Sequence, residues 1–343
     1  MLTLVVKNFG VLKDVEIQLN RINLFIGENG SGKSVLAKLI TIVTSIDIYS
    51  KSFLYEFGKL DIDFISNETI IKLFDVDDTK HILFTIKNKK MIFGDKVLNT
   101  IDINSKLNEP CTFFTSQYIP SERNLISLLN KSIYSLITSN IPLPKHLLDF
   151  ASQYEKARNA IQELKLLDME FKSINGQDRI YYDKSNFLSL ENSSSGMQSA
   201  LPLYLTLKYL NSKHNDIIVE EPEQNLYPKS QVETIKNIVE NSPNNLYLMT
   251  HSPYVLSTLN ILLFAYKAAN TNVTLKEKIS QIIPGSQQIN PDEFSAYFIE
   301  NGKAIDIKSK RGLISENAID DSSETIDDEF DKLMDIYREY KNV

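Results

Sequence analysis

Eight consecutive residues of the chain could hold a phosphate group. They are Gly27-Glu28-Asn29-Gly30-Ser31-Gly32-Lys33-Ser34, and they fit the pattern G-x-x-x-x-G-K-[ST] of a phosphate-binding loop. Glycines allow a tight turn whose N–H groups point inward at an anion, and the N-terminus of a following helix adds positive charge. The pattern predicts that Lys33 reaches the β- and γ-phosphates of a nucleotide and that Ser34 holds Mg²⁺.

Two further polar clusters follow apolar runs later in the chain. One run ends in Glu220, Glu221 and Glu223, and a second, over residues 246–250, ends at His251. Ligands of α/β sheets sit at the carboxyl ends of strands, so these side chains are candidates for one site. The alternative is a solvated acidic loop and a surface histidine.

A stretch of small residues, 192–199, precedes a predicted helix that carries Leu201, Leu205, Leu207 and Leu210. Small residues before a helix offer caps and exposed N–H groups, which makes this stretch a second candidate anion site. Most Ser-Gly turns bind nothing, so an ordinary helix cap is the alternative.

The elements around the phosphate loop agree with its assignment. Residues 2–7 and 14–19 are predicted as strands separated by a turn at Gly10, and residues 22–26 as a buried strand. Residues 35–40 are predicted as a helix. Strand, loop and helix in this order are the context that such a loop requires.

Three longer segments lie outside this arrangement. Residues from about 45 to 110 combine strand-like runs with turn signals, which predicts an antiparallel lobe. Residues 311–343 are predicted to form an acidic amphipathic tail, docked on its own domain or on a partner. Residues from about 124 to 172 are predicted to form a helical insertion, because apolar residues recur at spacings of three and four: Leu147, Phe150, Tyr154, Ala157, Ile161, Leu164, Leu167 and Phe171.

Composition limits the class of protein. The 343 residues are 42% apolar and 24% charged, an ordinary globular balance, with a net charge of −7. A dedicated nucleic-acid binder would more often be basic, which weakens a DNA-binding interpretation. The sequence has no signal peptide and no run of about 18 apolar residues, and Cys111 is its single cysteine. We therefore expect a cytoplasmic protein without a membrane span or an intrachain disulfide.

Taken together, the motifs resemble those of ABC-type ATPase heads of the SMC-like and RecF-like branch. The chain looks most like the stand-alone ATPases of bacterial anti-phage defence systems, relatives of the ATPase part of OLD-family proteins. The resemblance covers residues 1 to about 310, and the motifs occur in the family's order: Asn8-Phe9-Gly10, Gly27 to Ser34, Gln117 of the Q-loop, Ser195-Gly196-Met197-Gln198 of the signature, Glu220-Glu221-Pro222 of the Walker B strand, Glu223 to Pro228 at the D-loop, and the switch residue His251.

The resemblance implies an α/β fold, a P-loop NTPase head with a mixed central sheet, an antiparallel β lobe and a helical insertion. It also implies roles for single residues. ATP would be bound by Gly27, Glu28, Asn29, Gly30, Ser31, Gly32, Lys33 and Ser34 and, from a second subunit, by Ser195, Gly196 and Gln198. Mg²⁺ would be held by Ser34, Gln117 and Glu220, and the catalytic residues would be Glu221, His251 and Gln117.

The chain departs from the family's pattern at three positions. The Walker B acid is usually aspartate, and here it is Glu220, which is one methylene longer. Met197 stands where the signature usually has a second glycine, so fewer backbone N–H groups could approach the opposite γ-phosphate. Tyr227 replaces a polar residue of the D-loop. These departures predict slow or conditional turnover.

The leading interpretation is an ATP-hydrolysing, head-to-head dimeric switch in a defence system, which holds or releases a separately encoded effector such as a nuclease. The alternatives are a DNA-repair or recombination ATPase that clamps DNA, a transporter's nucleotide-binding subunit, and a nucleotide-gated scaffold with negligible hydrolysis. The acidic net charge counts against the DNA clamp, and the 45–110 segment fits a transporter subunit poorly.

Overall fold

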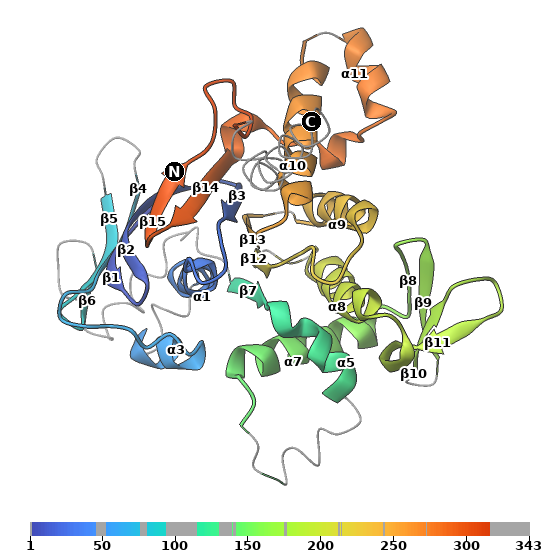
Figure 1. The fold of residues 1–343 in the computed structure, drawn as a ribbon, viewed down its shortest axis with the longest axis horizontal. Helices are drawn as coiled ribbons and strands as arrows, with labels where there is room; N and C mark the ends of the chain where they lie inside the picture. The colour runs from blue at the N-terminus through green and yellow to red at the C-terminus, as the bar shows by residue number, and fades with distance from the viewer. Residues whose placement is uncertain are drawn as a thin grey trace, which may run out of the picture.

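An eleven-stranded mixed sheet runs through the molecule in the order β6-β5-β4-β1-β2-β15-β14-β3-β13-β12-β7 (Figure 1). The computed structural model describes residues 2–45, 53–75, 81–93, 115–129, 139, 142–174, 177–211, 213, 215–242, 244–271 and 273–315. The strands of this sheet are β1 (Leu2–Phe9), β2 (Leu12–Leu19), β3 (Ile22–Ile26), β4 (Ile70–Asp75), β5 (His81–Lys87), β6 (Lys90–Phe93), β7 (Thr115–Ile119), β12 (Asn215–Glu220), β13 (Leu246–Thr250), β14 (Phe294–Glu300) and β15 (Lys303–Asp306).

The half of the sheet that carries the phosphate loop is parallel. β3 pairs with β13 and β14, and β12 pairs with β13 and β7, each in parallel. Every residue of β3 and β13 is buried, as expected for strands that are covered on both faces. Successive residues of β13 enter opposite cores, because side chains alternate along a strand.

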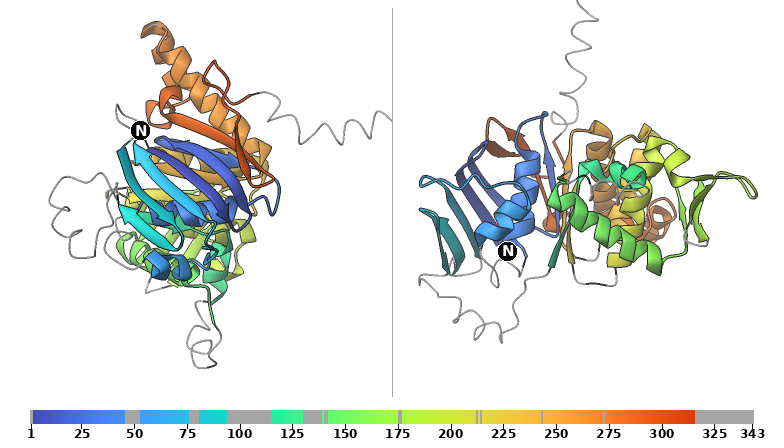
Figure 2. Two further views of the ribbon diagram at one scale, coloured as in Figure 1. Left: turned by 90° about the vertical axis from the view of Figure 1, so that its left-hand side faces the viewer. Right: turned by 90° about the horizontal axis from the view of Figure 1, so that it is seen from below.

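Helices cover the two faces of the sheet. On one face, α1 (Lys33–Val43) and α3 (Phe53–Lys59) pack on a core that includes Phe25, Ile218 and Tyr247. On the other face lie the larger helices around Leu24, Val219 and Leu248 (Figures 1 and 2). These helices are α7 (Lys145–Ala160), α8 (Ser195–Leu210), α9 (Pro228–Glu240) and α10 (Pro253–Ala269), with the shorter α5 (Leu125–Leu129) and α11 (Val273–Ser280) beside them.

The antiparallel half of the sheet confirms the predicted hairpin and lobe. β1 and β2 pair through a turn at Gly10, whose φ of 57° lies in the left-handed region that glycine adopts at low cost. β4, β5 and β6 continue from β1 as an antiparallel lobe. Of the segment predicted as this lobe, residues 46–52, 76–80 and 94–110 lie outside the described part of the chain.

The predicted helix over 161–172 is wrong. Helix α7 ends at Ala160, and the chain continues into a second, antiparallel sheet of β8 (Glu163–Leu166), β9 (Met169–Ile174), β10 (Gln177–Tyr181) and β11 (Phe187–Ser189). Leu167 and Asp168 have φ of 49° and 62°, and they form a two-residue turn that pairs Leu166 with Met169. This small sheet lies at the opposite end of the molecule from β4–β6 (Figure 2).

Within the predicted helical insertion, the structure has α5 and α7, and α7 buries Leu147, Phe150, Tyr154 and Ala157. Residues 130–138 and 140–141 of this segment lie outside the described part of the chain. The predicted α/β fold with a mixed central sheet is confirmed. The acidic tail predicted at 311–343 lies outside the described residues from position 316 onward. Among the helices that the structure describes, none combines the length and the apolar character needed to cross a bilayer.

Candidate functional site

The phosphate loop connects β3 to α1, as the sequence predicts. Gly32 precedes the helix with φ 109°, and a Cβ on it would lie 2.9 Å from side-chain atoms of both Val11 and Leu12. A Cβ on Gly27 would collide with the carbonyl oxygen of Ile299. Side chains of the β1–β2 turn and the backbone of β14 therefore leave no room for side chains at these two positions.

Lys33 lies in the first turn of α1 and is only 8% exposed. Its Nζ donates to the carbonyl oxygens of Gly27 at 2.6 Å and Glu28 at 2.8 Å, so the ammonium lies over the loop. Burial lowers the pKa of Lys33, and the carboxylates of Glu221 and Glu220 oppose this shift. The ammonium and the helix N-terminus together place positive charge at the loop, an arrangement that suits a phosphate group.

The carboxyl ends of three parallel strands meet beside this loop. β3 and β13 are in register, with Ile26 opposite Thr250, and β12 continues the alignment with Glu220 opposite Met249. The next residues on the three strands are Gly27, His251 and Glu221. The register therefore brings together three motifs that are far apart in the sequence.

Glu220 is the buried acid of this site, with 4% of its surface exposed. Burial raises its pKa to about 7, and hydrogen bonds from the hydroxyls of Tyr118 and Ser34 oppose that shift. Within the described residues its Oε1 atom has no hydrogen-bond partner. A hydroxyl and a carboxylate that meet at a phosphate loop are hard oxygen ligands of the kind that Mg²⁺ prefers, so Ser34 and Glu220 fit that ion.

Glu221 and His251 lie on the more open side of the site, with side-chain exposures of 34% and 39%. His251 Nε2 is 3.9 Å from Glu221 Oε1. Glu221 has φ 44°, an uncommon conformation for a non-glycine residue, and its N–H donates to the carbonyl of Met249 at 2.8 Å. This backbone turns the carboxylate of Glu221 away from the strand and toward the histidine.

Glu223 supports the segment that carries the histidine. Its Oε1 accepts from the hydroxyl of Thr250 at 2.6 Å and from the N–H of His251 at 3.1 Å, and the side chain is buried. The third acid of the cluster therefore positions His251.

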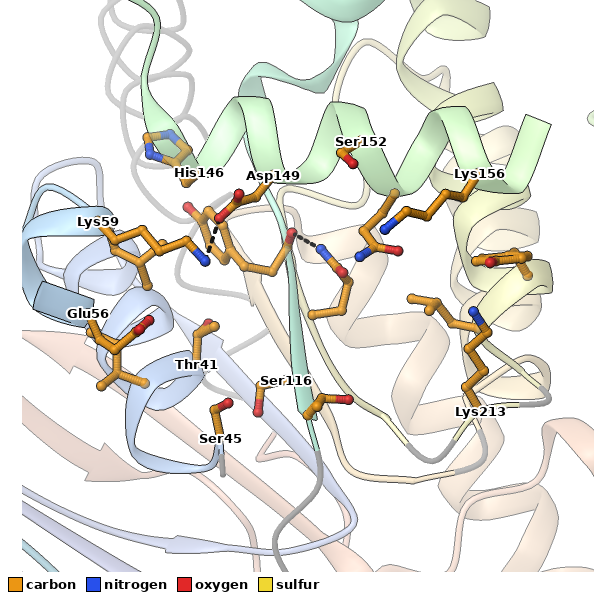
Figure 3. Close-up of a pocket in the computed structure, with 18 residues that line it drawn as sticks. Thr41, Ser45, Glu56, Lys59, Ser116, His146, Asp149, Ser152, Lys156 and Lys213 are labelled. Carbon is orange, nitrogen blue, oxygen red and sulfur yellow. Dashed lines mark hydrogen bonds and ion pairs between the residues drawn. The ribbon is translucent and has the colours of Figure 1, made fainter. Parts of the chain in front are cut away.

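Gln117 lies on β7 and lines a cavity of about 710 Å³ between α1, α3 and α7 (Figure 3). Its Nε2 donates to the carbonyl of Tyr118 at 3.0 Å. Lys59 and Asp149 form an ion pair of 2.7 Å at this cavity. Neighbouring side chains on a strand point to opposite faces, and it is the hydroxyl of Tyr118 that reaches Glu220. The metal and catalytic roles of Gln117 therefore stay predictions.

The signature stretch opens α8, as predicted. Ser195 is exposed, whereas a Cβ on Gly196 would lie 2.9 Å from the carbonyl oxygen of Asn225 in the D-loop. Gln198 donates through Nε2 to the carbonyls of Glu191 and Ser193, each at 3.1 Å, and so shapes the loop before the helix. Contacts of Ser195, Gly196 and Gln198 with a nucleotide stay predictions.

Met197 is 3% exposed and belongs to the hydrophobic core, so its side chain points into the molecule and not toward a facing subunit. Although Met197 stands where the family's signature usually has a glycine, its side chain does not cover the exposed side of the signature stretch.

Arg123 is the residue of this region that the sequence did not single out. It is fully buried, and its guanidinium donates to the carbonyl oxygens of Pro120, Ser199, Glu220 and Glu221. A lone arginine after a short strand carries no sequence signal of such a role.

The chain is similar to one protein family and to several solved structures. A family model described as "AAA domain, putative AbiEii toxin, Type IV TA system" matches residues 22–257. No curated protein matches the chain.

Solved structures with similarity to the chain include the SMC head domain from Thermotoga maritima, at 13% identity and a TM-score of 0.46, covering 89% of this chain and 97% of that one. Another is the Smc head domain with an extended coiled coil bound to the C-terminal domain of ScpA derived from Pyrococcus furiosus, at 11% identity and a TM-score of 0.43, covering 99% of this chain and 100% of that one.

The matched range 22–257 contains the phosphate loop, both Walker B acids and His251, and it spans well over half of the chain. The chain therefore belongs to this AAA-domain family.

Proposed function

We propose that the chain is an ATP-hydrolysing dimeric switch, the ATPase subunit of an anti-phage defence system that controls a separately encoded effector such as a nuclease. The observation that carries this proposal is the convergence of Lys33, Glu220, Glu221 and His251 at adjacent carboxyl ends of β3, β12 and β13. Phosphoryl transfer depends on positioning and charge neutralisation, and these four side chains supply both.

The two neighbouring acids differ in environment and therefore in role. Glu220 is buried against Ser34 and, together with it, would hold Mg²⁺, which neutralises charge on the phosphates when it is bound. Glu221 is one-third exposed and faces His251, so its carboxylate is free to orient a water molecule and accept its proton. His251 follows β13, the neighbour of the strand that leads into the phosphate loop, and it would contact the γ-phosphate that Lys33 would hold.

The place of the signature stretch supports a dimer. Ser195 is exposed at the N-terminus of α8, where the first N–H groups of a helix have no intrahelical acceptor. Ser194 caps the N–H of Met197, so the N–H groups of Ser195 and Gly196 are the ones left for an external anion. Tyr227 of the adjacent D-loop is 78% exposed and would belong to the same facing surface.

The defence role is supported by the motif resemblance and by the description of the family, which names a toxin of a type IV TA system. A switch that associates on binding ATP and separates after hydrolysis can pass its nucleotide state to a partner by mass action. Co-purification with the product of a neighbouring gene, with and without ATP, tests whether an effector is bound.

The decisive experiment is steady-state hydrolysis by the wild-type chain and by Glu221→Gln, with the mass in solution measured with and without ATP and Mg²⁺. We expect the wild type to hydrolyse ATP and Glu221→Gln to bind it, to stop turning over and to accumulate as a dimer. A variant that stays monomeric with ATP, or that hydrolyses at the wild-type rate, would show that Glu221 is not the catalytic base.

Two other outcomes would favour the competing functions. ATP binding by the wild type without measurable hydrolysis would favour a nucleotide-gated scaffold. Duplex DNA binding that weakens steeply with salt would favour a DNA clamp.

A further inference from the structure

Arg123 connects three segments that approach the candidate site from different parts of the chain. Its Nη2 donates to the carbonyl of Glu221 at 2.6 Å, and its Nη1 donates to the carbonyl of Glu220 at 2.8 Å and to that of Pro120 at 3.0 Å. Its Nε donates to the carbonyl of Ser199 in α8 at 3.1 Å. One planar group thus fixes the distances between the end of β7, the end of β12 and the signature helix.

This guanidinium is costly to bury. Arg123 has no exposed surface, and burial lowers its pKa to about 10, an effect that Glu223, Glu221 and Glu220 oppose. All four hydrogen-bond acceptors are backbone carbonyls, none of them a carboxylate. A buried charge contributes little net stability, so an arginine here is better explained by the geometry it imposes.

Arg123 directly contacts the backbone of Glu221, the proposed catalytic acid. Glu221 is held at φ 44°, a strained conformation for a non-glycine residue that persists only where the surroundings hold it. Its N–H donates to the carbonyl of Met249, and its own carbonyl accepts from Arg123 at 2.6 Å and from the N–H of Gln224 at 3.0 Å. Both backbone hydrogen-bonding groups of Glu221 are therefore held, and among these described partners Arg123 is the one that also donates a hydrogen bond to α8.

The contact with α8 reaches the surface that would face a second subunit. Ser199 lies one turn after Ser195, and its hydroxyl accepts from Asn225 of the D-loop at 3.1 Å. A displacement of α8 or of the D-loop would therefore move the carbonyl that Arg123 Nε contacts.

We infer that Arg123 is a positioning residue that holds the Glu221 peptide in its catalytic conformation and couples it to the signature helix. Closure of a second subunit on Ser195 would then be transmitted through α8 and the guanidinium to Glu221. The inference rests on the proposed ATP hydrolysis at this site. It assigns Arg123 no contact with the nucleotide.

The test compares Arg123→Lys and Arg123→Gln with the wild type in kcat, KM for ATP and directly measured ATP affinity. Lysine keeps the charge but lacks the planar fork, and glutamine keeps two donors without the cost of burying a charge, which protects against loss of folding. We expect kcat to fall by about 100-fold in both variants, as for a catalytic group displaced by about 1 Å, while ATP affinity stays within about twofold. Arg158→Lys is the matched control, because Arg158 pairs with Asp178 outside the site and should leave kcat unchanged.

A double-mutant comparison distinguishes positioning from general destabilisation. If Arg123 acts through Glu221, Arg123→Lys should lower the residual single-turnover rate of Glu221→Gln very little. Additive losses, an unchanged kcat, or a joint fall of kcat, ATP affinity and melting temperature would overturn the inference while leaving ATP hydrolysis standing. A wild-type chain that binds ATP without hydrolysing it would overturn the proposed hydrolysis and this inference together.

Discussion

Lys33 makes its two described hydrogen bonds with backbone carbonyls of its own loop, those of Gly27 and Glu28. The same ammonium would exchange these acceptors for phosphate oxygens, to which a charge-assisted hydrogen bond is stronger. The Lys33 side chain thus stabilises the loop through these two hydrogen bonds, and we expect it to bind phosphate through the same ammonium group.

Lys33→Ala should weaken ATP binding by about 10- to 100-fold, the equivalent of about 1.5–3 kcal/mol for a hydrogen bond to a charged group. The loss of its two loop contacts should lower the free energy of unfolding by about 1–3 kcal/mol. Calorimetric titration with ATP and urea unfolding measure the two effects. Lys229→Ala, a lysine whose side chain is 70% exposed, is the control. Unchanged ATP affinity in Lys33→Ala would refute the phosphate-loop assignment.

At the level of elements, the first turn of α8 both presents a residue at the surface and packs a residue in the core. Its first residue, Ser195, is exposed, and Met197 anchors the same turn in the core. The helix therefore presents Ser195 from a fixed position.

Met197→Ala should lower the free energy of unfolding by about 2–5 kcal/mol, because it opens a cavity in a packed core. Met197→Leu conserves volume and should cost less than about 1.5 kcal/mol. Urea unfolding of both variants gives the comparison. If the two variants were equally stable, Met197 would not be anchoring the helix.

The start of β12 carries a buried acid that is independent of the candidate site. Asp216 is 3% exposed and accepts from Asn245 Nδ2 at 3.1 and 3.2 Å. Burial raises its pKa from 3.8 to about 6, and the hydrogen bonds from Asn245 oppose that shift. Because the folded pKa lies above the unfolded one, the folded chain keeps the proton longer, so stability falls as the pH rises from about 4 to about 6.

The side chain at position 216 cannot titrate in Asp216→Asn. The free energy of unfolding of this variant, relative to that of the wild type, should therefore rise as the pH increases from about 4 to about 6. A shift of about 2 pKa units corresponds to at most about 3 kcal/mol. Urea unfolding at pH 4 and pH 7.5 measures it, with Asp14→Asn, an exposed strand residue, as the control. Parallel pH profiles for wild type and Asp216→Asn would contradict the argument.

At the scale of the whole molecule, the phosphate loop and the signature stretch belong to one chain but are proposed to act on different nucleotides. Gly196 is fixed in its own chain by the carbonyl of Asn225, and Ser195 is exposed beside it. This arrangement suits a surface that completes the site of a second copy.

Ser195→Arg should leave ATP binding unchanged and should block both hydrolysis and ATP-dependent dimerisation, by bulk and by charge. A mixture with Lys33→Ala should recover part of the activity, because one composite site then pairs an intact loop with an intact signature. Mass in solution and hydrolysis rate are the measurements. Normal hydrolysis by Ser195→Arg alone would show that the shared-site arrangement is wrong and that Ser195 only begins a helix.

The helices, strands and loops that are specified by residues close together in the chain could be predicted from the sequence. The phosphate loop, the strands that end at Glu220 and Thr250, helix α1 and the start of α8 all follow from local patterns of apolar residues, glycines and caps. Their meeting at one edge of the sheet also followed, because the carboxyl ends of parallel strands share that edge.

Only the tertiary structure decided two kinds of feature. These are contacts between residues far apart in the chain, and segments whose apolar spacing fits both a helix and a strand. Leu164 and Phe171 fit a helical stripe, but they face each other across a hairpin whose turn at Leu167 and Asp168 lacks the usual glycine. Tyr118, and not Gln117, faces Glu220, because the pairing of β7 with β12 sets which side chains share a face. Arg123 contacts carbonyls 76 to 98 residues away, and contacts of that range exist only once the chain has folded.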